Sequence, residues 1–190
     1  MENNTLNTAL LVMDMQQAVL HSLSDNLQII SNVAKSISAA RSHNIPVIYI
    51  TVGFRPGMPE ISASNKMFAA SKLRADQSLP GSMMMNIDER IAPADGDIMI
   101  VKRRVSAFTG SDLEVVLRSL EIKHLVLTGV ATSGVVLSTL REAADKDYQI
   151  TVLADCCTDR DANLHQVLVT KVFPMQANVI ELVEWCLTTT

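Results

Sequence analysis

The sequence predicts an α/β fold with three layers, in which a mostly parallel, Rossmann-like sheet of about six strands carries helices on both faces. Short apolar runs alternate with longer amphipathic stretches along the chain, as in βαβ units built around a parallel sheet. The apolar runs are nearly continuous, which indicates strands that are buried on both faces. With 190 residues, 48% of them hydrophobic, the chain has the size of one domain. No internal repeat or boundary divides residues 1–190, so we expect a single domain.

The elements follow from these patterns in order. Strands are expected at the apolar runs 8–13, 46–52, 97–101, 125–130, 149–154 and 178–180. Helices are expected over 27–42, 113–120, 134–146 and 162–172, with a short helix near 64–75 and another at the carboxyl end. Residues 27–42 place apolar side chains three or four positions apart, as one face of a helix requires. Ser111, with Glu114 three residues later, has the spacing of a capping box and is the expected N-cap of the helix over 113–120.

One segment, 54–96, breaks the alternation. It contains four of the six prolines and a run of three methionines at 83–85. A connection of this length is unusual within a compact domain and is typically a lid, a substrate loop or a partner surface. We expect 54–96 to be a lid or an interface; the alternative is irregular surface with a short helix.

The composition argues against several classes of partner. The net charge of −4 and the isoelectric point near 5.5 give no electrostatic reason to expect nucleic acid or an anionic membrane. The three cysteines show neither a disulfide framework nor the spacing of zinc ligands. The first residues do not resemble a signal peptide, and no apolar run approaches the roughly 18–20 residues of a membrane span. We therefore expect a cytoplasmic protein that acts on a small molecule.

Polar residues stand at the carboxyl ends of three predicted strands, where open parallel sheets bind ligands. Asp14 follows the first strand, Lys102 follows the third, and the turn 129–135 follows the fourth. An Asp and a Lys at one rim form a plausible acid/base pair, because the cation steadies the carboxylate. The turn leads into a helix, so its backbone N–H groups converge on one point. The alternative for each charged residue is a solvated or paired position without a role in catalysis.

The chain resembles the isochorismatase-like hydrolase superfamily, also called the cysteine hydrolases, over nearly its full length. Five segments carry the resemblance in their order and spacing: 9–16 (ALLVMDMQ), 96–104 (GDIMIVKRR), 106–113 (SAFTGSDL), 127–132 (LTGVAT) and 148–155 (YQITVLAD). The resemblance implies a catalytic Asp at Asp14 and a catalytic Lys at Lys102. It also implies a nucleophilic cysteine, in most members, at the position that Val135 occupies here.

The resemblance further implies that the turn binds the substrate. Backbone N–H groups near Val130, Ala131 and Thr132 would hold an oxyanion, and the peptide bond between Val130 and Ala131 would be cis. Family members that bind a metal do so through an Asp and histidines after the second strand. Here residues 52–57 contain no histidine, so we expect no metal and no cofactor. Arg55, in the same loop, is a candidate for a substrate carboxylate; the alternative is a solvated arginine.

Val135 removes the thiolate, so amide hydrolysis through a covalent cysteine intermediate is not expected. Cys156 and Cys157 are expected to pack in the structure, and His165 to serve packing or a dimer contact. No histidine is evident as a base for Thr132 or Ser133. Isochorismatases cleave a vinyl ether with an acid and water, which needs no thiolate.

Three functional hypotheses remain. The first is a hydrolase that uses Asp14, Lys102 and water, for which a vinyl ether such as isochorismate is one candidate substrate. The second is a catalytically inactive family member that acts as a binding or assembly protein. The third is a hydrolase with a relocated nucleophile, such as Ser133 or Cys157. The resemblance also implies a homo-oligomer, a dimer or a tetramer.

Overall fold

A six-stranded sheet forms the centre of the molecule in the computed structural model, which describes residues 7–21, 23, 26–78 and 86–188. The strand order is β3-β2-β1-β4-β5-β6, and all five neighbouring pairs are parallel. The strands are β1 (Thr8–Met13), β2 (Val47–Val52), β3 (Ile98–Lys102), β4 (His124–Val130), β5 (Gln149–Thr158) and β6 (Asn178–Ile180). The predicted fold class is confirmed.

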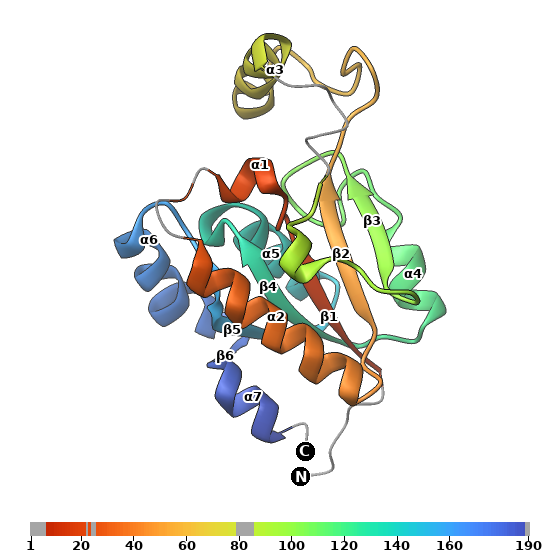
Figure 1. Cartoon of the computed structure of the whole chain (residues 1–190), viewed down its shortest axis with the longest axis vertical. Coiled ribbons are helices and arrows are strands. Elements are labelled where there is room, and N and C mark those ends of the chain that lie inside the picture. Colours follow the sequence, from red (N-terminus) through yellow and green to blue (C-terminus); the bar gives the residue numbers. More distant parts are fainter. Residues whose placement is uncertain (1–6, 22, 24–25, 79–85, 189–190) are drawn as a thin grey trace.

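Helices cover both faces of this sheet (Figure 1). They are α1 (Gln17–Leu20), α2 (Leu27–Ser42), α3 (Lys66–Ser78), α4 (Leu113–Ser119), α5 (Leu137–Asp145), α6 (Ala162–Val167) and α7 (Leu182–Thr188). Helices α2 and α7 pack on one face, and α4 and α5 pack on the other. Among the described residues, no helix is both long and apolar enough to span a membrane.

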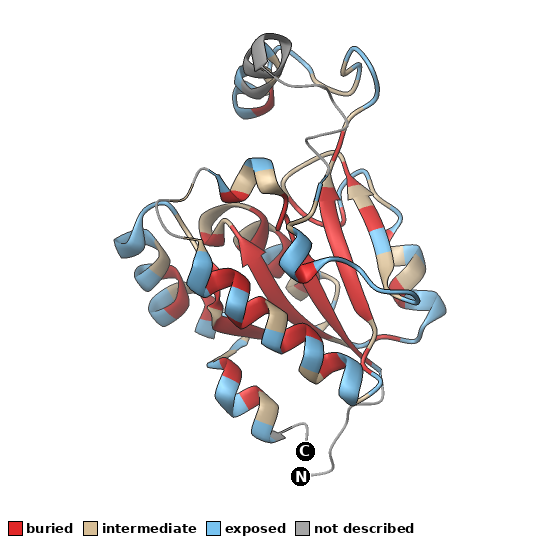
Figure 2. Ribbon diagram, in the orientation of Figure 1, coloured by how far each residue is buried: buried red, intermediate tan, exposed pale blue. Residues whose placement is uncertain are grey.

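The pleat of the strands divides the core into two layers. In β1, Ala9, Leu11 and Met13 belong to the layer under α4 and α5, whereas Leu10 and Val12 belong to the layer under α2 and α7. This is the period of two that sends successive side chains to opposite faces of a sheet. Figure 2 shows the result, with the central strands β1, β2 and β4 buried along nearly their whole length and helices exposed on their outer sides. The near-continuous apolar runs in the sequence reflect this double burial.

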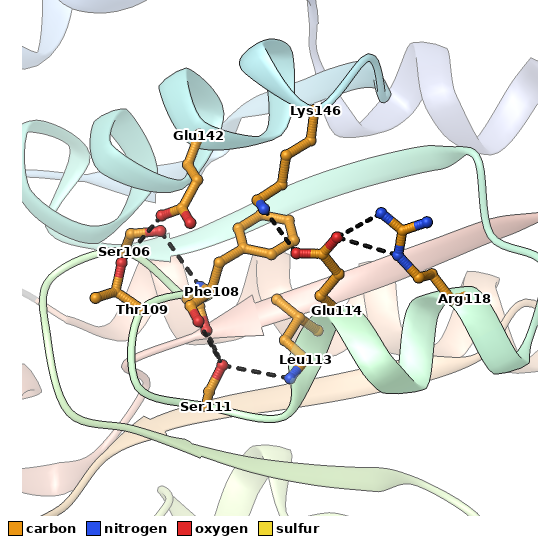
Figure 3. Close-up of polar contacts among 10 residues, drawn as sticks. Ser106, Phe108, Thr109, Ser111, Leu113, Glu114, Arg118, Glu142 and Lys146 are labelled. Atoms are coloured by element: carbon orange, nitrogen blue, oxygen red, sulfur yellow. Dashed lines mark hydrogen bonds and ion pairs between the residues drawn. The ribbon is translucent and has the colours of Figure 1, made fainter.

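The predicted capping box at the start of α4 is wrong. The N-cap is Asp112, and the Ser111 hydroxyl donates to the Ala107 carbonyl at 2.6 Å. Glu114 does not return to the cap, because its carboxylate accepts from Arg118 and from Lys146 of α5, each at 2.6 Å (Figure 3). The contact of Glu114 with Lys146, 32 positions away in the chain, thus takes the place of the predicted capping contact with the start of its own helix.

The segment 54–96 leaves the body of the protein and returns to it. Helix α3 projects beyond the carboxyl end of the sheet (Figure 1), close to the helix predicted near 64–75. The chain returns through an isolated bridge between Gln16 and Ile87 and a 3-10 turn, Glu89–Ile91. The methionine run at 83–85, like the first six residues, lies outside the described residues. A lid or interface role for the segment stays a prediction.

Candidate active site

Asp14 and Lys102 meet at the carboxyl ends of the strands. Asp14 follows β1 and Lys102 ends β3, with β2 between them in the sheet. Lys102 Nζ lies 2.9 Å from Asp14 Oδ2, and it also donates to the carbonyls of Arg104 and Val105, each at 3.0 Å. An ammonium has three protons, so these three acceptors use all of them. The predicted contact at the rim is therefore present, and the lysine is fully engaged.

The Asp14 carboxyl group is buried and only half satisfied. Its side chain is 12% exposed, Oδ2 pairs with Lys102, and Oδ1 has no hydrogen-bond partner in the part of the chain that the structure describes. Burial raises the pKa of Asp14 from 3.8 to about 6, although the charge and the hydrogen bond of Lys102 lower it. An unpartnered buried polar atom costs about 1–3 kcal/mol. Oδ1 is thus the carboxyl oxygen whose hydrogen-bonding capacity is unused within the described residues.

The backbone beneath Asp14 is fixed to β2. Asp14 has a φ of +53°, a left-handed conformation that aspartate tolerates better than most residues. Its N–H donates to the Ile50 carbonyl at 2.8 Å. Two residues later, the Gln16 amide accepts from the Val52 N–H at 2.9 Å and donates to the Val52 carbonyl at 3.1 Å. The carboxyl group is therefore presented from a rigid strand end.

The turn after β4 passes close to Asp14. Gly129 has a φ of +134°, and a Cβ at this position would lie 2.1 Å from the Met13 carbonyl oxygen, so no other residue fits. The Val130–Ala131 peptide bond is cis, as expected from the family resemblance. The Ala131 carbonyl then accepts from the N–H groups of Gly134 at 3.0 Å and Val136 at 3.3 Å. The close approach of β1 and β4 places the turn beside the Asp14 strand end.

Val135 lies in the apolar layer of this turn. Its side chain is 2% exposed and belongs to the same buried cluster as Met13 and Phe108. Valine has no atom that can attack a carbonyl or accept a proton. The position at which the resemblance places a cysteine is therefore filled by an inert, buried side chain.

His165 lies within hydrogen-bond distance of the turn, a contact that was not predicted from the sequence. His165 Nδ1 is 2.8 Å from Thr132 Oγ1, and the Asp159 carboxylate accepts from the Ser133 N–H at 2.7 Å. Burial lowers the pKa of His165, against the charge of Asp159, which raises it. Thr132 is fully buried, so the His165 contact anchors the turn instead of activating an accessible hydroxyl.

One local signal for this contact was present in the sequence. The Asp161 side chain accepts from the N–H groups of Asn163 and Leu164 and so caps α6. The helix that begins there carries His165 in its last turn, and it contacts the Thr132–Val136 segment. The pairing itself joins residues 33 positions apart, which no periodic pattern indicates.

The cysteines are buried or partly buried thiols. Burial raises the pKa of Cys157 to about 12, and it raises that of Cys156 even further. Both side chains lie in the core, as expected, while Cys186 is partly buried. A thiol with such a pKa is protonated near neutrality, and the thiolate is the nucleophile. Neither buried cysteine is therefore suited to replace the missing one.

Arg55 lies in the loop after β2 and pairs with Glu60, with Nη1 2.7 Å from Oε1. Its side chain is 67% exposed. Within residues 7–21, 23, 26–78 and 86–188, no three His, Cys, Asp or Glu side chains are grouped so that they could hold a metal ion.

Comparison with known proteins agrees with this geometry. The chain is 35% identical over 132 residues to N-carbamoylsarcosine amidase of Arthrobacter sp., a match that covers 70% of this chain but only 50% of that protein. It is 35% identical over 170 residues to the ureidoacrylate amidohydrolase RutB of Pseudomonas syringae pv. syringae, covering 78% of this chain and 69% of RutB. An isochorismatase family protein from Burkholderia thailandensis has the same fold, with a TM-score of 0.83 at 23% identity over 96% of this chain and 95% of the other. The profile of the Isochorismatase domain matches residues 8–184, and the chain belongs to the isochorismatase family of hydrolases.

Proposed function

We propose that the chain hydrolyses a small organic molecule with Asp14 as the proton-transferring group, Lys102 as the cation that positions it, and water as the nucleophile. One observation carries the proposal: a buried carboxyl group has one oxygen held by a lysine and the other without a partner. A general acid or base works best when its pKa lies near the operating pH. The Asp14 pKa of about 6 meets that condition.

Lys102 acts through Asp14 in this proposal. Its three hydrogen bonds leave no proton for a substrate, and its side chain is 2% exposed. A lysine held in this way is not placed to form a covalent bond with a carbonyl. Lys102 fixes the position of the Asp14 carboxyl group. Its charge also lowers the pKa of Asp14 against the effect of burial, so that Asp14 can both gain and lose a proton near neutrality.

A vinyl ether, such as isochorismate, is the first candidate substrate, because an acid and water suffice to cleave it. Protonated Asp14 transfers its proton to the terminal enol-ether carbon, and an oxocarbenium ion forms. Water adds to this ion and returns a proton to Asp14. The resulting hemiketal then breaks its C–O bond, giving a ketone and an alcohol. The absence of a nucleophilic side chain at Val135 favours this route.

A ureido or amide compound is the second candidate, favoured by the 35% identity to proteins named for amide hydrolysis. Here ionised Asp14 removes a proton from water, which attacks the carbonyl carbon. The proton then passes to the leaving nitrogen as the C–N bond breaks. Backbone N–H groups of the turn at Val130, Ala131 and Thr132 are the proposed donors to the oxyanion.

The test is turnover of a panel that contains isochorismate, ureidoacrylate and N-carbamoylsarcosine. Hydrolysis of at least one compound, lost in Asp14→Asn, is the expected result. Binding of a panel member without hydrolysis would instead favour an inactive binding protein, the alternative that the buried Val135 supports. A covalent adduct at Ser133 or Cys157 after incubation with substrate would replace the water route by a relocated nucleophile.

A further inference from the structure

Three arginines contact Glu60 beside the Asp14–Lys102 pair, two of them at its carboxylate and one at its backbone carbonyl, and the proposed reaction does not use them. We call Arg55, Arg103, Arg104 and Glu60 the arginine cluster. Glu60 Oε1 lies 2.7 Å from Arg55 Nη1 and 3.4 Å from Arg103 Nε. The Glu60 carbonyl accepts from Arg104 Nη2 at 2.9 Å. All three guanidinium groups thus contact the same residue.

The cluster adjoins the catalytic strand ends. Gly53, which follows β2, donates its N–H to the Lys102 carbonyl at 3.2 Å and accepts from Arg103 Nη1 at 2.7 Å. The Arg104 carbonyl accepts from Lys102 Nζ. The backbone that carries the arginines therefore also holds the lysine of the pair.

The three arginines differ in solvent exposure and in the number of contacts that hold their guanidinium groups. Arg103 is 25% exposed and is tied to the Gly53 carbonyl, and Arg104 donates to two carbonyls and lies 6.0 Å from the Phe68 ring centre. Arg55 is 67% exposed, and the Glu60 carboxylate is its ion-pair partner. The Glu60 side chain is 11% exposed, and its carboxylate also accepts from the Arg55 backbone N–H at 3.3 Å. Arg55 is therefore the arginine of the cluster whose guanidinium group is open to an incoming carboxylate.

The charges in the cluster do not cancel. Three guanidinium groups contact Glu60, whose carboxylate is the one anionic group among the four residues of the cluster, while Asp14 and Lys102 form an ion pair nearby. The cluster is therefore locally positive, although the net charge of the whole chain is −4. The planar guanidinium fork matches a carboxylate, with two parallel hydrogen bonds.

We propose that the arginine cluster recognises a carboxylate group of the substrate, which takes the place of the Glu60 carboxylate on Arg55 and Arg103. Glu60 then acts as an internal competitor that occupies the arginines when no substrate is bound. The substrate class is an organic acid whose hydrolysable bond reaches Asp14. This inference rests on the proposed function only in calling the bound acid a substrate.

The test is an NMR titration of isotope-labelled protein with N-carbamoylglycine and with its neutral amide, N-carbamoylglycinamide. These probes differ only in the carboxylate. The acid is expected to shift backbone signals of 53–60 and 103–106, and to bind at least about tenfold more tightly than the amide, as expected for a hydrogen bond to a charged group. Its affinity is expected to fall as NaCl is raised.

Variants separate recognition from a structural role. Arg55→Gln should weaken binding of the acid about tenfold to a hundredfold, whereas Glu60→Gln should strengthen it, because the competitor is removed. Arg118→Gln, an exposed arginine on α4, is the control of equal charge and should change nothing. Equal affinity for the two probes, no shifts at the cluster, or weaker binding in Glu60→Gln would overturn the proposal.

Binding and hydrolysis are measured separately, so the two proposals can fail separately. Asp14→Asn is expected to lose hydrolysis but to bind the acid as the parent protein does. If the acid binds at the cluster but no panel compound is hydrolysed, the proposed function fails and the recognition site stands. If hydrolysis occurs but the acid and the amide bind alike, the reaction stands and the cluster has no part in recognition.

Discussion

The pH dependence of hydrolysis follows from the burial of one carboxyl group. The rise in the pKa of Asp14 from 3.8 to about 6 corresponds to about 3 kcal/mol against the charged form. Below about pH 6 the group is mostly protonated, and above it mostly ionised. A vinyl ether needs the protonated form, so kcat/KM should fall about tenfold per pH unit above pH 6. An amide needs the ionised form, so kcat/KM should instead fall about tenfold per unit below pH 6.

Lys102→Met tests the cause of this dependence. The lysine lowers the pKa of Asp14, so its removal should move the inflection upward, by about 1–3 units for loss of an opposite charge at contact distance. The assay measures kcat/KM across about pH 5 to pH 8, because the pH dependence of kcat/KM reports the ionisable groups of the free enzyme. Unfolding curves show that the variant is folded. Lys123→Met, an exposed lysine before β4, should keep the inflection in place. A profile without an inflection near pH 6, or the same inflection in Lys102→Met, would refute the reasoning.

Three further predictions concern the turn after β4. Gly129→Ala should lower the free energy of unfolding by more than about 2 kcal/mol, because the added Cβ meets the Met13 carbonyl at 2.1 Å; urea unfolding measures this, and an unchanged midpoint would contradict the close approach. His165→Phe should cost about 1–2 kcal/mol of stability through the lost bond to Thr132 and should lower kcat with little change in KM; loss of stability with an unchanged kcat would leave the contact purely structural. Val135→Cys should add a thiol that, like Cys157, stays unreactive toward iodoacetamide near neutrality in the folded protein, since the position is 2% exposed in the same apolar cluster and burial raises the pKa of a thiol; peptide mass spectrometry measures this, and rapid labelling of the new cysteine would contradict its burial. Labelling of the natural Cys157 in the folded parent protein would contradict the raised pKa of its thiol.

The fold was predictable because its central strands are buried on both sides. Each central strand is a run of apolar residues, and the amphipathic stretches between them have the period of a helix. The end of β5 was not predictable: the strand runs on to Thr158 because its pairing with β4 shifts register between Leu127 and Gly129 and resumes at Gly129 and Cys157. That extension depends on the neighbouring strand, not on the residues of β5 alone.

Some features of the candidate site could likewise be predicted from the sequence, and others could not. Asp14 and Lys102 could be paired from sequence, since both stand at carboxyl ends of strands in one parallel sheet. The anchoring of Thr132 by His165 and the gathering of arginines around Glu60 could not. Each joins segments far apart in the chain through side chains that no periodic pattern marks.

The most direct test of the central claim is the hydrolysis of a panel substrate by Asp14→Asn at about pH 6. Asparagine keeps the shape of the side chain but cannot transfer the proton. The account predicts a loss of about a hundredfold or more in kcat, the usual contribution of a general acid or base, while Asp147→Asn at the exposed opposite end of the sheet keeps full activity. Equal turnover by Asp14→Asn and the parent protein would contradict the account.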